Sequence, residues 1–250
     1  MLRRELEYFF GALRFFTRLP VPGWVGHSAE ALNHSSRYFP LVGIIVGFLG
    51  ALAFALTSFF WPKTLAVLLA MAATILVTGA FHEDGWADTV DGLGGGWERN
   101  RILEIMKDSR IGSYGAIALT LMLLGKFMAL VELDALLVGP ALIAGHAFSR
   151  LCATLMMRAL DYARAEGKAK PLATKIGNGE LALAAAFGLL PLFLLPPLAA
   201  LCAVTLAALA ALYLGFKFEK WLGGYTGDCL GATQQLAEVA FYLGLLCRFS

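Results

Sequence analysis

The chain has 250 residues, of which 59% are hydrophobic and 15% are charged. A soluble domain usually carries about a quarter charged residues. The deficit, with a mean hydropathy of +0.71, excludes an ordinary soluble domain and favours a polytopic membrane protein. The net charge of +2 is too small to indicate nucleic acid as a partner.

The N-terminal segment predicts an amphipathic helix that lies in the membrane interface. Leu6, Phe9 and Leu13 recur at helical spacing, whereas charged residues such as Arg4 and Arg14 occupy other positions. No small-residue cleavage site follows this segment, so we do not expect a cleavable signal peptide.

Long apolar runs predict about six to seven transmembrane helices. A run needs roughly 17 to 25 residues to cross the hydrocarbon as a helix. In chain order, the expected spans are residues 39–61, 64–81, 113–133, 135–157, 181–196, 198–216 and the shorter 236–246. The connectors between most neighbours are short, which indicates antiparallel hairpins. We therefore expect an all-α, polytopic helical bundle in the lipid bilayer that forms a single domain.

Positive charge distinguishes the two sides of this bundle. The expected long connectors, residues 82–112, 158–180 and 217–235, hold most of the lysines and arginines. The opposite side receives only Lys63 before the C-terminal tail. Because cytoplasmic loops carry the excess of Lys and Arg, this asymmetry predicts a cytoplasmic N-terminus and cytoplasmic connectors.

The second expected span runs directly into an acidic segment, residues 82–92. If the helix continues, Asp84, Asp88 and Asp91 occur at i, i+4 and i+7, along one stripe. Stacked carboxylates repel one another, whereas Mg²⁺ takes carboxylate oxygens and shares its other positions with phosphate and water. The stripe therefore predicts a Mg²⁺ site. The alternative is an acidic helix end solvated at the membrane surface, which explains one aspartate better than three in register.

A second polar group precedes the third expected span. Asp108 could complete the metal site, while Lys107 and Arg110 can pair with phosphate oxygens. The alternative is a positively charged flank of the span, with helical pairing of Glu104 and Asp108.

Two further features are candidates for substrate binding. Asp228 lies in a glycine-rich turn and could bind a hydroxyl group or a metal; a helix N-cap is the alternative. His146 and Arg150, four residues apart within an expected span, favour a polar cavity, because buried charges are costly in a bilayer. A structural interhelical role is the alternative. The expected connector at 158–180 is either a lid over the site or a solvated loop.

These groups together favour phosphoryl transfer from a nucleotide-activated donor. A metal would neutralise the diphosphate while an Asp or His takes the proton of the acceptor. The phosphate-binding motif G-x-x-x-x-G-K-[ST] does not occur in the sequence, which excludes a P-loop nucleotide hydrolase. The four cysteines form no C-x-x-C pair, so we expect neither a disulfide framework nor a zinc site.

The same motifs resemble the cobalamin synthase family, the adenosylcobinamide-GDP ribazoletransferases of the bacterial inner membrane. The matching stretches are Phe-Phe-Thr-Arg-Leu-Pro-Val-Pro at 15–22, Phe-Pro-Leu-Val-Gly at 39–43, Phe-His-Glu-Asp-Gly-Trp-Ala-Asp-Thr-Val-Asp-Gly at 81–92, Met-Lys-Asp-Ser-Arg-Ile-Gly at 106–112, Ser-Arg at 149–150 and Thr-Gly-Asp-Cys-Leu-Gly-Ala at 226–232. The chain departs from the family at Glu83-Asp84-Gly85-Trp86, where Leu-Asp-Gly-Leu is common, which leaves the role of Glu83 open.

The resemblance implies a specific reaction with Mg²⁺ as cofactor. GDP-activated adenosylcobinamide and α-ribazole, or its 5′-phosphate, would join through a phosphodiester and release GMP, on the cytoplasmic side of a multi-pass inner-membrane protein. Asp84, Asp88 and Asp91 would hold metal and diphosphate. The other phosphate ligands implied are Lys107, Asp108 and Arg110. Candidates for the base that deprotonates the ribazole hydroxyl are His82, Asp88 and Asp91, and Arg150 would line a wide cavity.

Two other classes fit less well. The CDP-alcohol phosphotransferases open with D-x-x-D-G, as Asp88–Gly92 does, but their following Ala-Arg dipeptide is replaced by residues 93–96. A cation transporter would use the intramembrane charges of Lys126, His146 and Arg150, but it predicts acidic residues deep inside spans. A homo-oligomer is compatible with the sequence, which does not determine the oligomeric state.

Overall fold

The computed structural model describes residues 2–26, 29–164 and 176–247. The helices are α1 (Leu2–Phe16), α2 (Ala29–Ser35), η1 (Ser36–Tyr38), α3 (Phe39–Thr57), α4 (Lys63–Thr78), α5 (Phe81–Gly95), α6 (Arg99–Ile105), α7 (Ser113–Glu132), α8 (Ala135–Ala159), α9 (Asn178–Leu189), η3 (Leu190–Leu194), α10 (Pro197–Leu222) and α11 (Gly227–Leu245). Apart from one isolated bridge between Tyr162 and Tyr225, no strand forms in the described parts. The all-α prediction is confirmed.

Four helices are long and apolar enough to cross a membrane: residues 31–57, which end with α3, and α7, α8 and α10. We treat these four as the membrane-spanning helices. α7 and α8 agree closely with the spans expected at 113–133 and 135–157, and α10 extends the span expected at 198–216 to Leu222. The expected total of six to seven is not confirmed, since the described residues contain four such helices, or five spans if a bent pair counts as one.

The bent pair consists of α4 and α5, which meet at 87°. The span expected at 64–81 ends at Thr78, because Gly79 and Ala80 both adopt left-handed backbone conformations, with φ of 66° and 58°. Ala80 is the only described residue other than glycine with positive φ, a conformation that costs energy when a Cβ is present. The chain therefore turns sharply before Phe81 and starts a new helix.

Helices occupy most of two segments that were expected to be connectors. α5 and α6 form within 82–112, and the segment 217–235 is largely taken up by the end of α10 and the start of α11. α11 thus begins well before the span expected at 236–246. The apolar stretch expected at 181–196 forms the shorter pair α9 and η3. Polar residues suggested solvated loops, but tertiary contacts bury many of them, including Glu83, Gln234 and Gln235.

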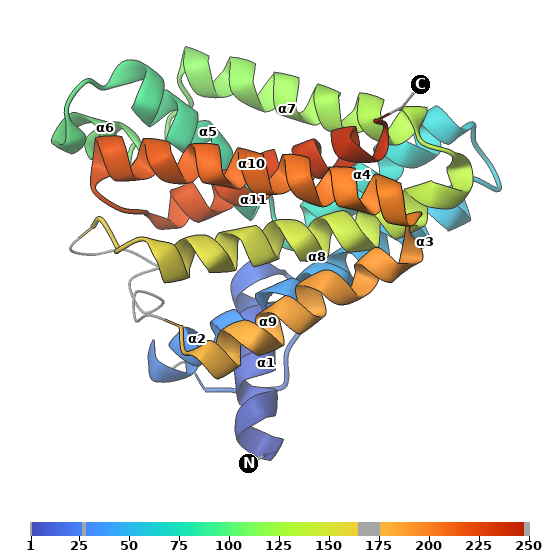
Figure 1. Cartoon of the computed structure of the whole chain (residues 1–250), viewed down its shortest axis with the longest axis horizontal. Coiled ribbons are helices and arrows are strands. Elements are labelled where there is room, and N and C mark those ends of the chain that lie inside the picture. Colours follow the sequence, from blue (N-terminus) through green and yellow to red (C-terminus); the bar gives the residue numbers. More distant parts are fainter. Residues whose placement is uncertain (1, 27–28, 165–175, 248–250) are drawn as a thin grey trace.

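Figure 1 shows how this arrangement gathers the polar helices at one end of the bundle. α7, α8 and α10 run approximately along the long axis, while α1 crosses them at a steep angle (Figure 1). α5 and α6 lie at the end where α7 begins and α10 finishes (Figure 1). α11 packs against α5, α8 and α10, so it connects the polar end with the apolar interior.

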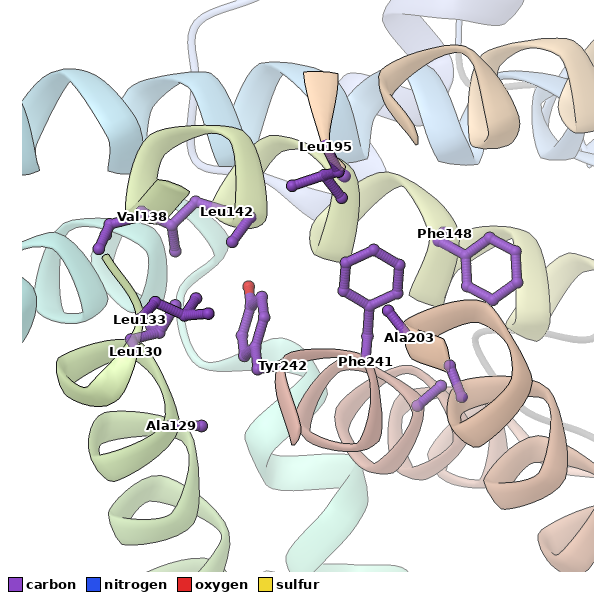
Figure 2. Close-up of a cluster of buried hydrophobic side chains, with 14 of the residues drawn as sticks. Ala129, Leu130, Leu133, Val138, Leu142, Phe148, Leu195, Ala203, Phe241 and Tyr242 are labelled. Carbon is purple, nitrogen blue, oxygen red and sulfur yellow. The ribbon is translucent and has the colours of Figure 1, made fainter. Parts of the chain in front are cut away.

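Two hydrophobic clusters hold the bundle together. The first joins α1 and α3 to α8, α10 and the start of α11, and includes Phe16, Phe39 and Phe218. The second lies where α7, α8, α10 and α11 meet (Figure 2). Leu130, Leu142 and Phe241 are almost fully buried there, and the ring of Tyr242 lies among them with its hydroxyl towards α8 (Figure 2). Close packing of this kind fixes the positions of the helices that carry the polar residues.

Candidate active site

The site begins at the crossing of α5 and α11, where two glycines allow the helices to touch. A Cβ on Gly85 would lie 2.9 Å from the carbonyl oxygen of Asp228 and 3.3 Å from the Cα of Gly231. A Cβ on Gly231 would in turn lie 3.2 Å from the carbonyl oxygen of His82. Small residues permit such close helix packing. The acidic motif of α5 and the glycine-rich motif of α11 therefore form one site.

This crossing brings three aspartates together. Asp84 is exposed and Asp88 half-buried on α5, while Asp228 lies in the first turn of α11. Burial and the neighbouring carboxylates of Asp84 and Asp228 raise the pKa of Asp88 to about 7. Burial also raises the pKa of Asp228, and the guanidinium of Arg164 opposes that effect. The cluster is a place where negative charge accumulates and a cation would be stabilised.

Arg164 is positioned by a short backbone pairing between the segment after α8 and the segment before α11. The N–H of Tyr225 donates to the carbonyl of Asp161 at 2.9 Å, and the N–H of Ala163 donates to the carbonyl of Tyr225 at 2.8 Å. Nη2 of Arg164 then lies 2.9 Å from Oδ2 of Asp228. The result is a cation held beside the aspartates.

A cavity of about 280 Å³ opens beside this cluster. Its lining comes from α1, α3, α5, α8, α11 and the segment after α8, and consists of Phe15, Phe16, Phe39, Phe81, His82, Asp84, Arg150, Ala153, Tyr162, Arg164, Gly227, Asp228, Leu230, Gly231 and Gln234. The cavity is therefore bounded by both carboxylates and guanidinium groups. Such a combination suits a ligand with anionic oxygens and a bound cation.

His82 lines the cavity but is mostly enclosed. Its ring stacks on Phe16, with centroids 5.3 Å apart and planes inclined by 16°. Burial and the positive charge of Arg150 hold the pKa of His82 well below its usual range. His82 is thus a neutral imidazole in the cavity wall.

Arg150 reaches the cavity from the centre of α8 and is only 2% exposed. Its Nη1 lies 3.1 Å from Nδ1 of His146 and donates to the carbonyl of His146 at 3.0 Å. Its Nε has no hydrogen-bond partner in the described parts of the chain. A buried guanidinium N–H of this kind is costly unless a ligand accepts from it.

A buried polar network lies behind Arg150, between α5, α7, α8 and α11. Glu238 is fully buried, 3.0 Å from Nζ of Lys126 and 3.2 Å from Nδ1 of His146. Gln235 accepts from Lys126 at 2.8 Å and donates to Glu83 at 3.0 Å. The intramembrane charges thus compensate one another in a structural network, and Glu83, whose role the sequence left open, is part of it.

Asp91 has a different environment from the other two aspartates of its stripe. It is 7% exposed and accepts hydrogen bonds from the backbone N–H groups of Gly112 at 2.7 Å and Gly115 at 2.8 Å. These groups lie at the N-terminus of α7, where N–H groups have no partner within the helix. Asp91 therefore caps α7 and does not line the cavity. The metal and catalytic roles expected for it from the sequence stay predictions.

We expect Asp91→Ala to lower the free energy of unfolding by about 1–2 kcal/mol, since loss of a helix cap costs that much. Thermal unfolding in detergent would measure the loss, and turnover per folded molecule would be retained. Normal stability with lost turnover would instead support the metal-binding role predicted from the sequence.

The second predicted phosphate group lies outside the cavity. Nη2 of Arg110 donates to Oδ2 of Asp108 at 2.6 Å, and the Arg110 side chain is 87% exposed. The hydrogen bond from Arg110 lowers the pKa of Asp108 to about 2. Lys107 is also exposed. The structure therefore brings Asp84, Asp228, His82 and Arg150 to the cavity, but not Lys107, Asp108 or Arg110.

Several lining residues were absent from the sequence prediction. Phe15, Phe16, Phe39 and Phe81 look like membrane-facing or core residues when each is taken alone. Their only signal was that all four lie in the stretches that carried the family resemblance. Arg164 was part of the expected connector at 158–180, of which residues 165–175 lie outside the described residues.

The donor set fits a magnesium ion that is shared with a substrate. Within the described residues, no three His, Cys, Asp or Glu side chains are gathered closely enough to hold a metal by themselves. Mg²⁺ commonly uses one or two protein carboxylates and completes its shell with phosphate oxygens and water. The mutual repulsion of Asp84, Asp88 and Asp228 is consistent with such a cation.

Comparison with known proteins gives matches over almost the whole chain. A family model described as cobalamin-5-phosphate synthase matches residues 8–246. An adenosylcobinamide-GDP ribazoletransferase of Shewanella amazonensis is 49% identical over 254 aligned positions, which cover 99% of this chain and 98% of the relative. The same enzyme of Shewanella frigidimarina is 47% identical over 248 positions, covering 97% and 95%. No solved structure matches the chain.

Proposed function

Because the chain belongs to the cobalamin-5-phosphate synthase family, we propose that it is an adenosylcobinamide-GDP ribazoletransferase. It joins GDP-activated adenosylcobinamide to α-ribazole, or to its 5′-phosphate, through a phosphodiester and releases GMP. The observation that supports this proposal best is the cavity that combines Asp84 and Asp228 with Arg150 and Arg164. Carboxylates for a metal and guanidinium groups for phosphate are the groups that phosphoryl transfer requires.

The residues of the site have separate roles, in binding phosphate oxygens, in holding a metal and in deprotonating the acceptor hydroxyl. Arg150 and Arg164 bind phosphate oxygens, and the unpartnered Nε of Arg150 supplies a donor for one of them. One or two of the carboxylates of Asp84, Asp88 and Asp228, together with phosphate oxygens of the substrate, would hold Mg²⁺, which would neutralise the diphosphate and stabilise the leaving GMP. A carboxylate of this group that is not engaged by the metal takes the proton of the attacking hydroxyl.

The proposed location is the bacterial inner membrane, with the site facing the cytoplasm. The basis for this orientation is charge, since Arg99, Arg101, Lys107 and Arg110 lie at the same end of the bundle as the cavity and cytoplasmic segments carry such an excess. The cytoplasm also supplies nucleotide-activated substrates. α1, with Leu2 and Leu6 exposed, would lie in the membrane interface.

The direct test uses the purified full chain with Mg²⁺, GDP-activated cobinamide and α-ribazole. The expected products are the cobalamin and GMP in equal amounts. Release of GMP without any dependence on α-ribazole would contradict the proposal, because it would indicate a hydrolase. The transporter alternative is not supported, because the intramembrane charges are paired with one another.

We further expect Mg²⁺ to stabilise the protein more at about pH 8 than at about pH 6. The folded-state pKa of Asp88, about 7, lies above the ordinary value of 3.8 for an aspartate. Protonated Asp88 therefore contributes stability that is complete below about pH 4 and is lost as the pH rises through 7. Above that pH the carboxylates repel one another, so a cation has more repulsion to relieve.

Melting temperatures with Mg²⁺ and with EDTA at both pH values would measure this effect. Asp88→Asn is the matched variant, since it keeps the shape of the side chain but cannot titrate. The difference between the two pH values should shrink in this variant. Equal stabilisation by Mg²⁺ at both pH values in the wild-type protein would argue against a metal at these aspartates.

A further inference from the structure

One wall of the cavity consists of aromatic rings from three helices. Phe15 and Phe16 come from α1, Phe39 from the start of α3 and Phe81 from the start of α5. The rings meet edge to face, with centroid distances of 4.4 Å for Phe16 and Phe39, and 5.4 Å for Phe15 and Phe81. Phe16 and Phe39 are buried, whereas Phe15 and Phe81 are only partly covered. The last two therefore offer ring surface to a ligand.

The aromatic wall and the aspartates face the same cavity at close range. Phe81 and Asp84 are three residues apart on α5, so they are neighbours on one face of the helix. Both line the cavity, as does Asp228 from α11. A ligand in this cavity thus meets both an apolar surface and carboxylates with guanidinium groups. The matching ligand has a flat apolar part joined to a polar part that carries hydroxyl groups.

The volume limits which substrate can fit. At about 280 Å³ the cavity is slightly smaller than the roughly 300–1,000 Å³ of typical small-molecule sites. A corrinoid macrocycle is much larger than that, so the bulk of the cobinamide substrate has to lie outside. Two smaller aromatic groups take part in the proposed reaction, namely the guanine of the GDP moiety and the benzimidazole of α-ribazole.

The phenyl rings of the wall favour one of these two bases over the other. Guanine carries a carbonyl, an amino group and a ring N–H, and each would lose hydrogen bonds to water against phenyl rings without gaining a partner. A benzimidazole presents a largely apolar ring, which gains from edge and face contacts with phenylalanine. The wall therefore favours the benzimidazole.

We propose that this cavity is the subsite for the acceptor nucleoside. The benzimidazole of α-ribazole packs against Phe15 and Phe81, and its ribose points towards Asp84 and Asp228. The corrinoid of the GDP-activated substrate stays outside the cavity, and its diphosphate reaches in to the same aspartates and to the guanidinium groups. This inference rests on the proposed function, and it adds which of the two substrates the cavity selects.

The test compares Phe81→Leu and Phe81→Ala with the wild-type full chain in detergent. Leucine keeps the position apolar and so protects folding, but it removes the aromatic face. We expect the KM for α-ribazole to rise about tenfold in the alanine variant and by less in the leucine variant. The KM for GDP-activated cobinamide should stay within about twofold, because that substrate does not contact the wall. Equilibrium dialysis with α-ribazole alone should show the same loss of affinity.

Phe9→Leu is the matched control, because Phe9 lies on α1 and packs on Phe10 and Tyr38 but does not line the cavity. It should leave both KM values unchanged. The subsite is refuted if the wild-type protein forms GMP and cobalamin but both Phe81 variants bind α-ribazole with unaltered affinity. It is also refuted if the KM for the GDP substrate is the one that rises. Failure of the wild-type protein to form either product would refute the proposed function itself.

Discussion

Replacing Asp84 by asparagine should reduce GMP release by roughly 10²- to 10⁴-fold, the range typical of a residue that acts directly in proton transfer or on a metal. Asp84 is exposed to the cavity, next to Asp228 and one helical turn from Asp88. Its carboxylate has no hydrogen bond in the described structure that would explain it as a structural residue, in contrast to Asp91. Asparagine keeps the size of the side chain and removes only the charge, so the helix crossing should stay intact.

The assay is turnover at saturating concentrations of both substrates, together with thermal unfolding of the same preparation. Asp108→Asn is the informative comparison, because the sequence placed both aspartates in one metal site. The structure leaves Asp108 in an exposed pair with Arg110, so its loss should cost less than about tenfold in turnover. Turnover retained in Asp84→Asn would remove Asp84 from the active site. Equal losses in both variants would restore the metal site predicted from the sequence.

The second large effect concerns the stability of the bundle. Glu238→Leu should lower the free energy of unfolding by about 3–5 kcal/mol, as expected when one partner of a buried ion pair is lost. Glu238 is fully buried and lies 3.0 Å from Nζ of Lys126. It is also within electrostatic range of Arg150. Its removal leaves two buried cations with the single carboxylate of Glu83.

The double variant Lys126→Met with Glu238→Leu tests this explanation. Removing both charges leaves Arg150 and Glu83, which balance each other, so much of the lost stability should return. Thermal unfolding of the two single variants and the double variant would give the coupling between the sites. The explanation fails if Glu238→Leu is as stable as the wild-type protein. It also fails if the double variant is no more stable than Glu238→Leu, since the network would then not depend on charge balance.

Local sequence signals were sufficient to predict those features whose whole pattern lies within one helix. The hydrophobic runs of α7 and α8 determine their own ends, because each begins and ends at polar or helix-terminating residues. The spacing of Asp84 and Asp88 likewise shows, without any tertiary contact, that both lie on one face of their helix. The family resemblance also followed from local motifs, and the matches over the whole chain confirm it.

Other features depend on contacts between distant segments. The break at Gly79 and Ala80 was not predicted, because an apolar run gives no sign of a left-handed turn at its end. Asp91 was assigned to the metal because helical spacing shows which residues share a face, but not what lies opposite that face. Its partners are the N–H groups of Gly112 and Gly115, more than twenty residues further along the chain.

The sequence by itself thus determined a helical membrane enzyme of a particular family, with an acidic stripe after an apolar helix. Tertiary structure alone decided which carboxylates line the cavity. The physical reason is that a charged side chain acquires its role from its nearest partners, and only the packed bundle supplies them. Asp84 faces a cavity opposite Asp228, Asp91 caps a helix, and Glu83 joins a buried network, although all three belong to one short motif.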